Sequence, residues 1–225
     1  MKGKIIVIEG TDCSGKETQS RLLIEKMTVA GRRVRRLSFP MYDTPTGRIV
    51  GGPYLGKPQM MEGWFDEGAP HVDPKVSALY FAADRLYNLP KIERLLGEGF
   101  DVILDRYVWS NFAHQGGKIA GRKQRMKMYD FLERLEFGLL ELPRPDVTIF
   151  LHMPFRAAVK LREGRAEKAD QNEADAAHLQ HAEQTYVELA KKYDFKTVEC
   201  ADGDQPRTIS AIAEDVFGLV MGSAP

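Results

Sequence analysis

The sequence predicts an α/β fold in which a parallel, five-stranded sheet carries helices on both faces. Two observations lead to this prediction. Short apolar runs alternate along the chain with longer helical patterns, and such alternation is typical of parallel sheets with right-handed crossovers. A glycine-containing segment, EGTDCSGKETQS at 9–20, joins the first apolar run to the first helical pattern. The length of 225 residues suits a single domain spanning 1–225.

The predicted strands are mostly continuous apolar runs, the pattern of strands that are buried on both faces. The first, KIIVIE, ends at Glu9, where the glycine-containing segment begins. The five segments are 4–9, 34–39, 100–105, 145–153 and 195–200. Because ligands collect at the carboxyl ends of such strands, the functional residues are expected at that edge.

The predicted helices follow apolar residues at helical spacing. The first ends at Gly31, a C-terminal cap. The second runs from Asp73 to Leu96; Asp73 and Pro74 provide its start signal, and Pro90 predicts a kink or break. The other helical segments are 122–141, a charged helix and loop at 156–173, a long helix ending near 193, and a closing helix from about 206.

The segment after the first strand has the spacing of a phosphate-binding loop, GxxxxGK, in Gly10, Gly15 and Lys16. Backbone N–H groups of such a loop and the following helix N-terminus form an anion-binding concavity, and the lysine adds a point charge. This context makes the fold P-loop NTPase-type. The motif normally continues with Ser or Thr, but here Glu17 takes that place and Thr18 follows it.

The third strand ends in Asp105-Arg106. A carboxylate at a strand end beside a phosphate loop can hold Mg²⁺, and a neighbouring arginine can clamp a phosphate. The alternative is a structural Asp–Arg pair at the strand end. On the second helix, Phe81 and Arg85 are four residues apart and share a face, so they could stack on a base and bind its edge. The alternative is a core phenylalanine and a solvated arginine.

The charged stretch REGRAEKADQNEAD at 162–175 is either a solvated hinge or a mobile lid. In a lid, arginines close over the triphosphate. Arg162 and Arg165 are the candidates, and Arg165 is favoured because it lies deeper in the run.

Composition excludes some functions. Lys plus Arg equals Asp plus Glu at 32 each, which argues against binding a nucleic acid polymer. Cys13 and Cys200 form neither a disulfide framework nor a metal spacing, so a reducing compartment fits. The N-terminal apolar stretch is too short for a signal peptide or a membrane span, which predicts a cytoplasmic protein with no membrane association. We expect the helix residues His178 and His181 at the surface.

Taken in order, these pieces resemble the thymidylate kinase family over nearly the whole chain. The matching segments are EGTDCSGKETQ, FPMYDTPTG, LYFAADR, DRYVWSNFAHQGG, PDVTIFL, and a lid followed by DQNE and YVELAKKY. The resemblance implies ATP- and Mg²⁺-dependent phosphorylation of dTMP to dTDP. It also implies a homodimer whose small-molecule substrates are dTMP and ATP, with a lid at about 162–173.

The resemblance also implies residue roles. The ATP phosphate cradle is Gly10, Thr11, Asp12, Cys13, Ser14, Gly15, Lys16, Glu17 and Thr18. Catalytic roles fall to Lys16, Asp12, Arg106 and a lid arginine, Arg165, because the loop itself contains no arginine. The acceptor site is Phe39, Pro40, Phe81, Arg85, Arg106, Ser110 and Gln115. Asp105 and Thr18 are the candidate metal ligands.

Four positions depart from the family pattern: Glu17, Tyr42 in place of an arginine near the acceptor phosphate, His114 in place of Tyr or Phe, and Gln171 in place of a lid arginine. They leave two alternatives open. One is a kinase for another deoxynucleotide or a deoxynucleoside. The other is a nucleotide-binding protein with impaired catalysis.

Overall fold

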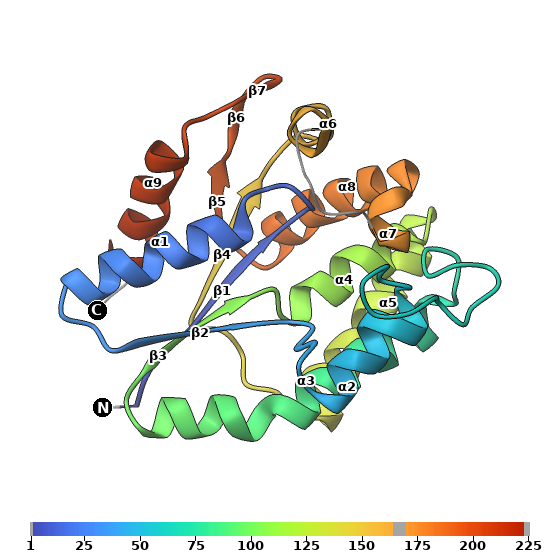
Figure 1. Cartoon of the computed structure of the whole chain (residues 1–225), viewed down its shortest axis with the longest axis horizontal. Coiled ribbons are helices and arrows are strands. Elements are labelled where there is room, and N and C mark those ends of the chain that lie inside the picture. The colour runs from blue at the N-terminus through green and yellow to red at the C-terminus, as the bar shows by residue number, and fades with distance from the viewer. Residues whose placement is uncertain (1, 164–169, 223–225) are drawn as a thin grey trace.

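A computed structural model describes residues 2–163 and 170–222. Its main sheet contains β1 (Ile5–Gly10), β2 (Val34–Ser38), β3 (Asp101–Asp105), β4 (Val147–His152) and β5 (Lys196–Glu199). The strand order is β2-β3-β1-β4-β5, and all neighbouring strands are parallel (Figure 1). The predicted parallel, five-stranded sheet is therefore confirmed.

Helices cover both faces of the sheet (Figure 1). On one face lie α1 (Lys16–Val29) and α9 (Ile209–Gly222); on the other lie α3 (Pro74–Gly97), α4 (Val108–Gly117) and α8 (Ala176–Lys192), with α5 (Arg122–Glu133) against α4. The shorter elements are α2 (Pro45–Ile49), the π-helical turns η1 (Val50–Tyr54) and η2 (Arg134–Leu139), α6 (Phe155–Glu163), α7 (Gln171–Ala174), and the hairpin β6 (Ala201–Asp202) and β7 (Gln205–Pro206).

The central strand explains why both faces need a helical cover. Successive side chains of a strand point to opposite faces. In β1, Ile5 and Val7 pack into the core on the α3, α4 and α8 side, whereas Ile6 and Ile8 pack into the core beneath α1 and α9. All four are buried, so β1 is apolar on both sides, as its sequence predicted.

The carboxyl ends of β1 and β3 lie beside each other, since Ile8 pairs with Asp105 in the sheet register. The buried carboxylate of Glu9 ties this edge to α4. It accepts hydrogen bonds from the backbone N–H groups of Tyr107 (2.9 Å) and Ser110 (3.0 Å), and so satisfies the first turn of a helix that has no local side-chain cap. Burial raises the pKa of Glu9 above its usual value.

Several predicted helices differ in detail. The helix of α3 runs through Pro90 without a break, and Pro90 is solvent-exposed, where water can satisfy the carbonyl group that proline leaves unbonded. The predicted helix 122–141 changes at Arg134 into η2. The elements α2, η1 and α4 were not predicted. In the charged segment 156–173, the described parts form α6 and the start of α7.

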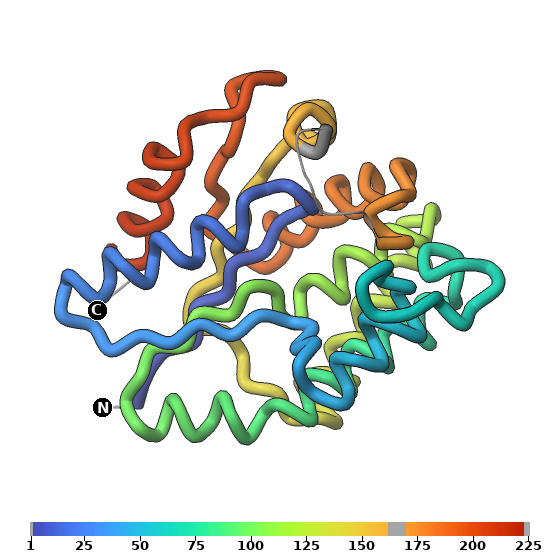
Figure 2. The backbone as a smooth tube through the Cα atoms, in the orientation of Figure 1, coloured from blue at the N-terminus to red at the C-terminus, as the bar shows by residue number. Residues whose placement is uncertain are grey.

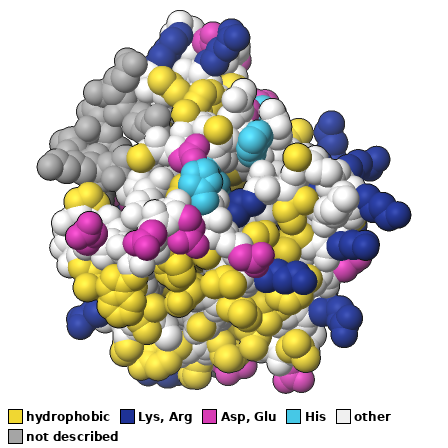
Figure 3. All heavy atoms as spheres, turned by 90° about the vertical axis from the view of Figure 1, so that its right-hand side faces the viewer, with side chains coloured by type: hydrophobic (Ala, Val, Ile, Leu, Met, Phe, Trp, Pro, Cys, Tyr) yellow, Lys and Arg dark blue, Asp and Glu magenta, His cyan; other side chains and the backbone are white. Residues whose placement is uncertain are grey.

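Two further features of the surface matter below. The connection from η1 to α3, residues 55–73, loops out beside α7 (Figure 2). Apolar side chains gather over the lower part of the face in Figure 3, at the level of α2 and α3. Exposed apolar residues of α3 are Val76, Leu79, Leu86 and Tyr87.

Candidate active site

The phosphate-loop geometry depends on two of its glycines. A Cβ on Gly10 would lie 2.5 Å from Ser14 Oγ and 2.8 Å from the Leu151 carbonyl oxygen, so no larger residue fits. Gly15 has φ +81°, a left-handed conformation that favours glycine. The helix α1 starts at Lys16 without a side-chain cap, which leaves its first N–H groups available to an anion.

Lys16 is buried at the head of this loop, and its Nζ donates to the Thr11 carbonyl oxygen at 2.6 Å. Burial and the neighbouring Arg106 lower the pKa of Lys16 to about 8, although nearby carboxylates act in the opposite direction. Glu17 and Thr18 are exposed at the rim. The carboxylate of Glu17 pairs with Arg21 one turn along α1, at 2.8 Å.

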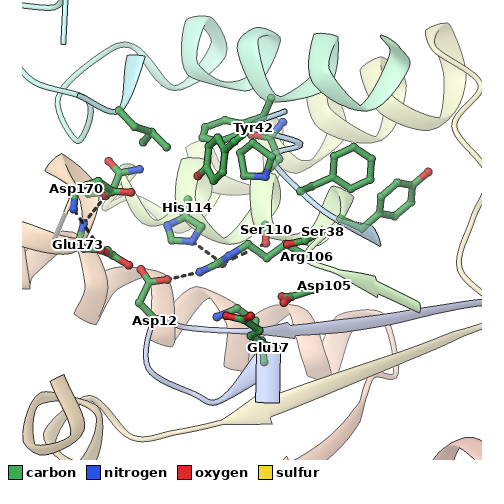
Figure 4. A pocket seen from close by; sticks show the side chains of 18 of the residues that line it. Asp12, Glu17, Ser38, Tyr42, Asp105, Arg106, Ser110, His114, Asp170 and Glu173 are labelled. Atoms are coloured by element: carbon green, nitrogen blue, oxygen red, sulfur yellow. Dashed lines mark hydrogen bonds and ion pairs between the residues drawn. The ribbon is translucent and has the colours of Figure 1, made fainter. Parts of the chain in front are cut away.

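Arg106 connects the loop to α4. Its backbone has φ 65°, an unusual conformation for a residue with a side chain. The guanidinium pairs with the Asp12 carboxylate, and its Nη1 lies 3.3 Å from the Gly10 carbonyl oxygen and 3.4 Å from Ser110 Oγ (Figure 4). Burial alone would raise the pKa of Asp12, but the charges of Arg106 and Lys16 outweigh it and hold that pKa well below its usual value.

Asp105 does not pair with the arginine next to it. Its carboxylate contacts Arg36 of β2 at 2.5 Å, and Arg36 also donates to Ser20 Oγ at 2.6 Å. The strand end therefore carries two separate ion pairs, Asp105–Arg36 and Asp12–Arg106. Both acids lie on the cavity wall.

A cavity of about 570 Å³ opens beside the loop. It brings together most of the predicted site: Asp12, Cys13, Gly15, Lys16, Glu17, Thr18, Phe39, Pro40, Phe81, Arg85, Asp105, Arg106, Ser110 and Gln115. Gly10, Thr11 and Ser14 lie behind this wall, within the loop. Arg165 and the side chain of Arg162 lie outside the described residues.

The end of the cavity away from the loop is aromatic and hydrogen-bonding. Phe81 is half-buried, and its ring packs edge-on against Tyr54, with centroids 5.4 Å apart. Arg85 is buried rather than solvated, because it pairs with Glu136 of η2. Phe39 packs at 6.0 Å against Tyr107. Aromatic rings of this kind can stack on a flat base.

Lys57 is a cavity residue that the sequence analysis did not identify. It comes from the loop after η1, and its Nζ lies 3.5 Å from the Asp170 carboxylate and 5.1 Å from the centre of the Tyr42 ring. Lys57 thus supplies a positive charge near Tyr42, where the family pattern has an arginine.

His178, expected at the surface, is buried and stacked on His114 of α4, with ring centroids 5.2 Å apart. His114 Nδ1 and His178 Nε2 are 3.1 Å apart, and His114 Nε2 lies 3.5 Å from Arg106 Nη1. An arginine can only donate, so His114 Nε2 accepts and its Nδ1–H donates to His178. Burial lowers both pKa values, that of His178 to about 4, so both rings are neutral at pH 7.

Gln171 points away from the cavity. Its Oε1 accepts from the Ala69 N–H at 2.8 Å, and its backbone N–H donates to the Leu55 carbonyl oxygen at 3.2 Å. Gly56 and Gly63 make room for the amide: a Cβ at either would lie within 2.9 Å of Nε2. Gln171 therefore joins α7 to the 55–73 loop, while the neighbouring Asp170 and Glu173 line the cavity (Figure 4).

The phosphate loop lies at the carboxyl edge of a parallel sheet and opens to a cavity with a strand-end arginine and aromatic side chains. These features define a P-loop nucleotide-binding protein of the kinase type. A family model, thymidylate kinase, matches residues 8–205. The chain belongs to the thymidylate kinase family.

Individual proteins agree with this assignment. The chain is 30% identical to the thymidylate kinase of Homo sapiens over 215 residues, covering 96% of this chain and 88% of the human protein. It is 32% identical over 192 residues to that of Mycobacterium tuberculosis strain H37Rv, covering 83% and 85%. The solved structure of a thymidylate kinase from Candida albicans shares the fold, with TM-score 0.76, 24% identity, and 98% and 92% of the two chains covered.

Proposed function

We propose that the protein transfers the γ-phosphoryl group of ATP to dTMP, forming dTDP and ADP. The position of Arg106 carries this proposal. Its guanidinium contacts the phosphate loop at Gly10 and Asp12, and it lines the same cavity as Phe81 and Arg85. We assign the acceptor phosphate to Arg106 and the acceptor base to Phe81 and Arg85. The acceptor phosphate already bears an anionic oxygen, so no strong general base is needed.

On the donor side, we assign the ATP phosphates to the loop from Gly10 to Thr18. Free N–H groups at the start of α1 and the ammonium of Lys16 support this role, since both act where charge gathers during transfer. We assign the lid to about 162–173, within one kinase domain, 1–225. Its arginines Arg165 and Arg162 would complete the site as α6 closes.

On the acceptor side, we assign the phosphate to Arg106 and the nucleoside to Phe39, Pro40, Phe81, Arg85, Ser110 and Gln115. All of these residues lie on the cavity wall. Lys57 adds a second cation on the Tyr42 side. Lys57 is paired with Asp170 in the ligand-free site. An acceptor phosphate would be a second anionic partner for it, and this supports a phosphorylated acceptor over a bare nucleoside even though the family arginine is missing.

The site also suits Mg²⁺, which favours one or two carboxylates together with substrate phosphates. Among the described residues, no group of three or more His, Cys, Asp or Glu side chains could hold a metal on its own. Asp105, with Thr18 at the rim, would hold the ion together with the phosphates of ATP. The bound ion would neutralise charge on the phosphates during transfer.

Two finer proposals concern the setting. The exposed apolar residues of α3 support a homodimer, because a contiguous apolar area on a helix favours association. The sequence contains two cysteines, Cys13 and Cys200, whose spacing suits neither a disulfide framework nor a metal site, and this supports a reducing compartment and so the cytoplasm. Within the described residues, no helix is long and apolar enough to cross a membrane.

The decisive experiment measures ADP release by the purified protein with Mg-ATP and a panel of acceptors: dTMP, dUMP, dCMP, dGMP and thymidine. We expect the highest kcat/KM with dTMP. Turnover of thymidine but not dTMP would identify a nucleoside kinase instead. ATP binding without turnover of any acceptor would identify a protein with impaired catalysis.

A further inference from the structure

The guanidinium of Arg85 is held in one orientation. Its Nε donates to Glu136 Oε2 at 2.9 Å, and its Nη2 pairs with Glu136 Oε1. Both residues are buried, with Glu136 at 0% exposure. Two parallel hydrogen bonds fix the plane of a guanidinium. These two hydrogen bonds do not use Nη1, which lies 3.5 Å from the Tyr107 carbonyl oxygen. Both Arg85 and Tyr107 lie on the cavity wall.

The same carboxylate fixes the amide of Asn111 on α4. Asn111 Nδ2 donates to Glu136 Oε1 at 2.8 Å and to the Ala78 carbonyl oxygen at 3.1 Å. Both partners are acceptors, so the amide nitrogen must face them and Oδ1 must face away. In the described structure Oδ1 is buried without a hydrogen-bond partner, although Asn111 lines the cavity. An unpaired buried acceptor calls for a ligand donor.

Glu136 reaches this position because of the π-helical turn η2, which continues α5. An added residue in a helical turn rotates the side chains that follow it, and such turns are frequent at functional sites. Three residues earlier, Glu133 pairs with the exposed Arg144 at 2.7 Å and does not line the cavity. Glu136 is instead turned inward, where a carboxylate is costly to bury unless it is fully paired.

We propose that Glu136 is the positioning residue that sets base selectivity, by holding a donor of Arg85 beside the free oxygen of Asn111. This inference rests on the proposed function, since it requires a nucleotide acceptor. A donor next to an acceptor complements a carbonyl beside a ring N–H, the imide edge of thymine and uracil. Cytosine presents an amino group beside a bare ring nitrogen, so it is mismatched at both positions.

The test compares kcat/KM for dTMP, dCMP and dUMP in the wild type and in Glu136→Gln. The amide of glutamine has one acceptor oxygen, so in either orientation its NH₂ group would face a donor of Arg85, and the arrangement of Arg85 and Asn111 is disturbed. We expect kcat/KM for dTMP to fall about 30-fold, with dCMP changing less than about threefold, because sites built to hydrogen-bond one edge discriminate strongly. The dTMP:dUMP ratio should stay within about twofold, since both bases share the edge. The KM for ATP should also stay at the wild-type value.

Two further variants keep the result interpretable. Glu133→Gln removes a nearby carboxylate that lies away from the cavity and should leave the dTMP:dCMP ratio unchanged. Glu136→Asp keeps the charge but shortens the side chain, and it is measured if Glu136→Gln does not fold. It should lower the dTMP:dCMP ratio of kcat/KM at least about threefold. An unchanged ratio in the folded Glu136 variant overturns the proposal.

The outcomes for Glu136 and for the proposed function can be told apart. A wild-type protein that does not phosphorylate dTMP contradicts the proposed function. In that case, equilibrium binding of dTMP and dCMP to the wild type and to Glu136→Gln still tests Glu136. Equal loss of both affinities, or no loss of either, would show that Glu136 does not select the base.

Discussion

Glu17 departs from the phosphate-loop pattern at one position, and its surroundings limit what that departure affects. Its carboxylate is exposed and paired with Arg21, so it does not fill the anion-binding concavity of the loop. The backbone geometry of Gly10 and Gly15 and the charge of Lys16 are unchanged by it. What it removes is a hydroxyl group at the place where a P-loop holds its metal.

We therefore expect Glu17→Thr to change the Mg²⁺ dependence more than ATP binding. The Mg²⁺ concentration for half-maximal activity should fall about threefold or more, because a hydroxyl ligand is gained and a competing carboxylate is lost. ATP binding measured without Mg²⁺ should change less than about threefold. A Mg²⁺ titration that superimposes on the wild type would show that position 17 lies outside the reach of the metal.

The His114–His178 pair makes stability depend on pH. Both pKa values are lowered in the folded protein, so the unfolded chain, with pKa near 6.5, binds more protons below that value. The stabilisation is present above the unfolded pKa of about 6.5 and is lost as pH falls below it; for His178 the loss continues down to about pH 4. Between pH 7.5 and 5.5 the loss should be about 1 kcal/mol for each histidine.

Urea unfolding at pH 7.5 and 5.5 measures this effect. The double variant His114→Phe with His178→Phe removes both titrating groups while keeping the stacked rings. On acidification from pH 7.5 to 5.5, its free energy of unfolding should therefore fall by about 2 kcal/mol less than that of the wild type. Equal pH slopes in the two proteins would mean that the pair is already protonated or already exposed in the fold.

At the scale of single residues, sequence patterns identify candidate site residues where these are close in the chain or sit at strand ends. The loop Gly10–Thr18 and the strand-end Arg106 follow from local pattern, and the cavity brings most of them together. Lys57 and Glu136 were not predicted, since each meets its partner through tertiary packing. A buried glutamate in a helical run looks like any surface glutamate until its partner 51 residues away, Arg85, is known.

At the scale of elements, one side chain makes a large part of the contact between α7 and the 55–73 loop. Gln171 inserts its amide beside Gly56 and Gly63 and bonds to the Ala69 N–H. The family arginine at this position is absent, but the glutamine is engaged with the 55–73 loop rather than with the cavity. The departure thus changes how the base of the predicted lid is anchored.

We expect Gln171→Ala to loosen α7, since it removes the side-chain hydrogen bond and leaves a gap between the glycines. Hydrogen exchange of the α7 amides should accelerate about tenfold, and kcat should fall about three- to tenfold as Asp170 and Glu173 lose their positions. Gln180→Ala, on the exposed side of α8, is the matched control. Unchanged exchange rates would place the anchoring in the backbone alone.

The elements also show where local sequence is sufficient. All five parallel strands and the long helices were predicted, because buried runs and helical spacing are local signals. The helix α4 was not, since its N-terminal cap is Glu9, about a hundred residues earlier in the chain. The π-helical turns were not predicted as such. The turn η2 lies inside the predicted helix 122–141, and nothing in the apolar spacing marks where the wider turn begins.

At the scale of the whole molecule, the exposed side of α3 is the surface that we expect to meet a second copy. Leu79 is 51% exposed and has Val76 one turn away. Leu79→Asp places a charge there and should shift the protein from dimer to monomer by light scattering after size exclusion. Val29→Asp, on α1, changes an isolated exposed residue and should leave the mass unchanged. A monomeric wild type would refute the dimer.

The pairing of Asp12 with Arg106 has a consequence for what can enter the ligand-free site. The arginine already holds a tethered anion, which acts as an internal competitor at high effective concentration. A singly charged ion such as chloride gains too little to displace it. A dianionic phosphate monoester, able to engage Arg106 in a fork of hydrogen bonds, gains more. The resting pocket thereby screens incoming anions by charge before any base is read.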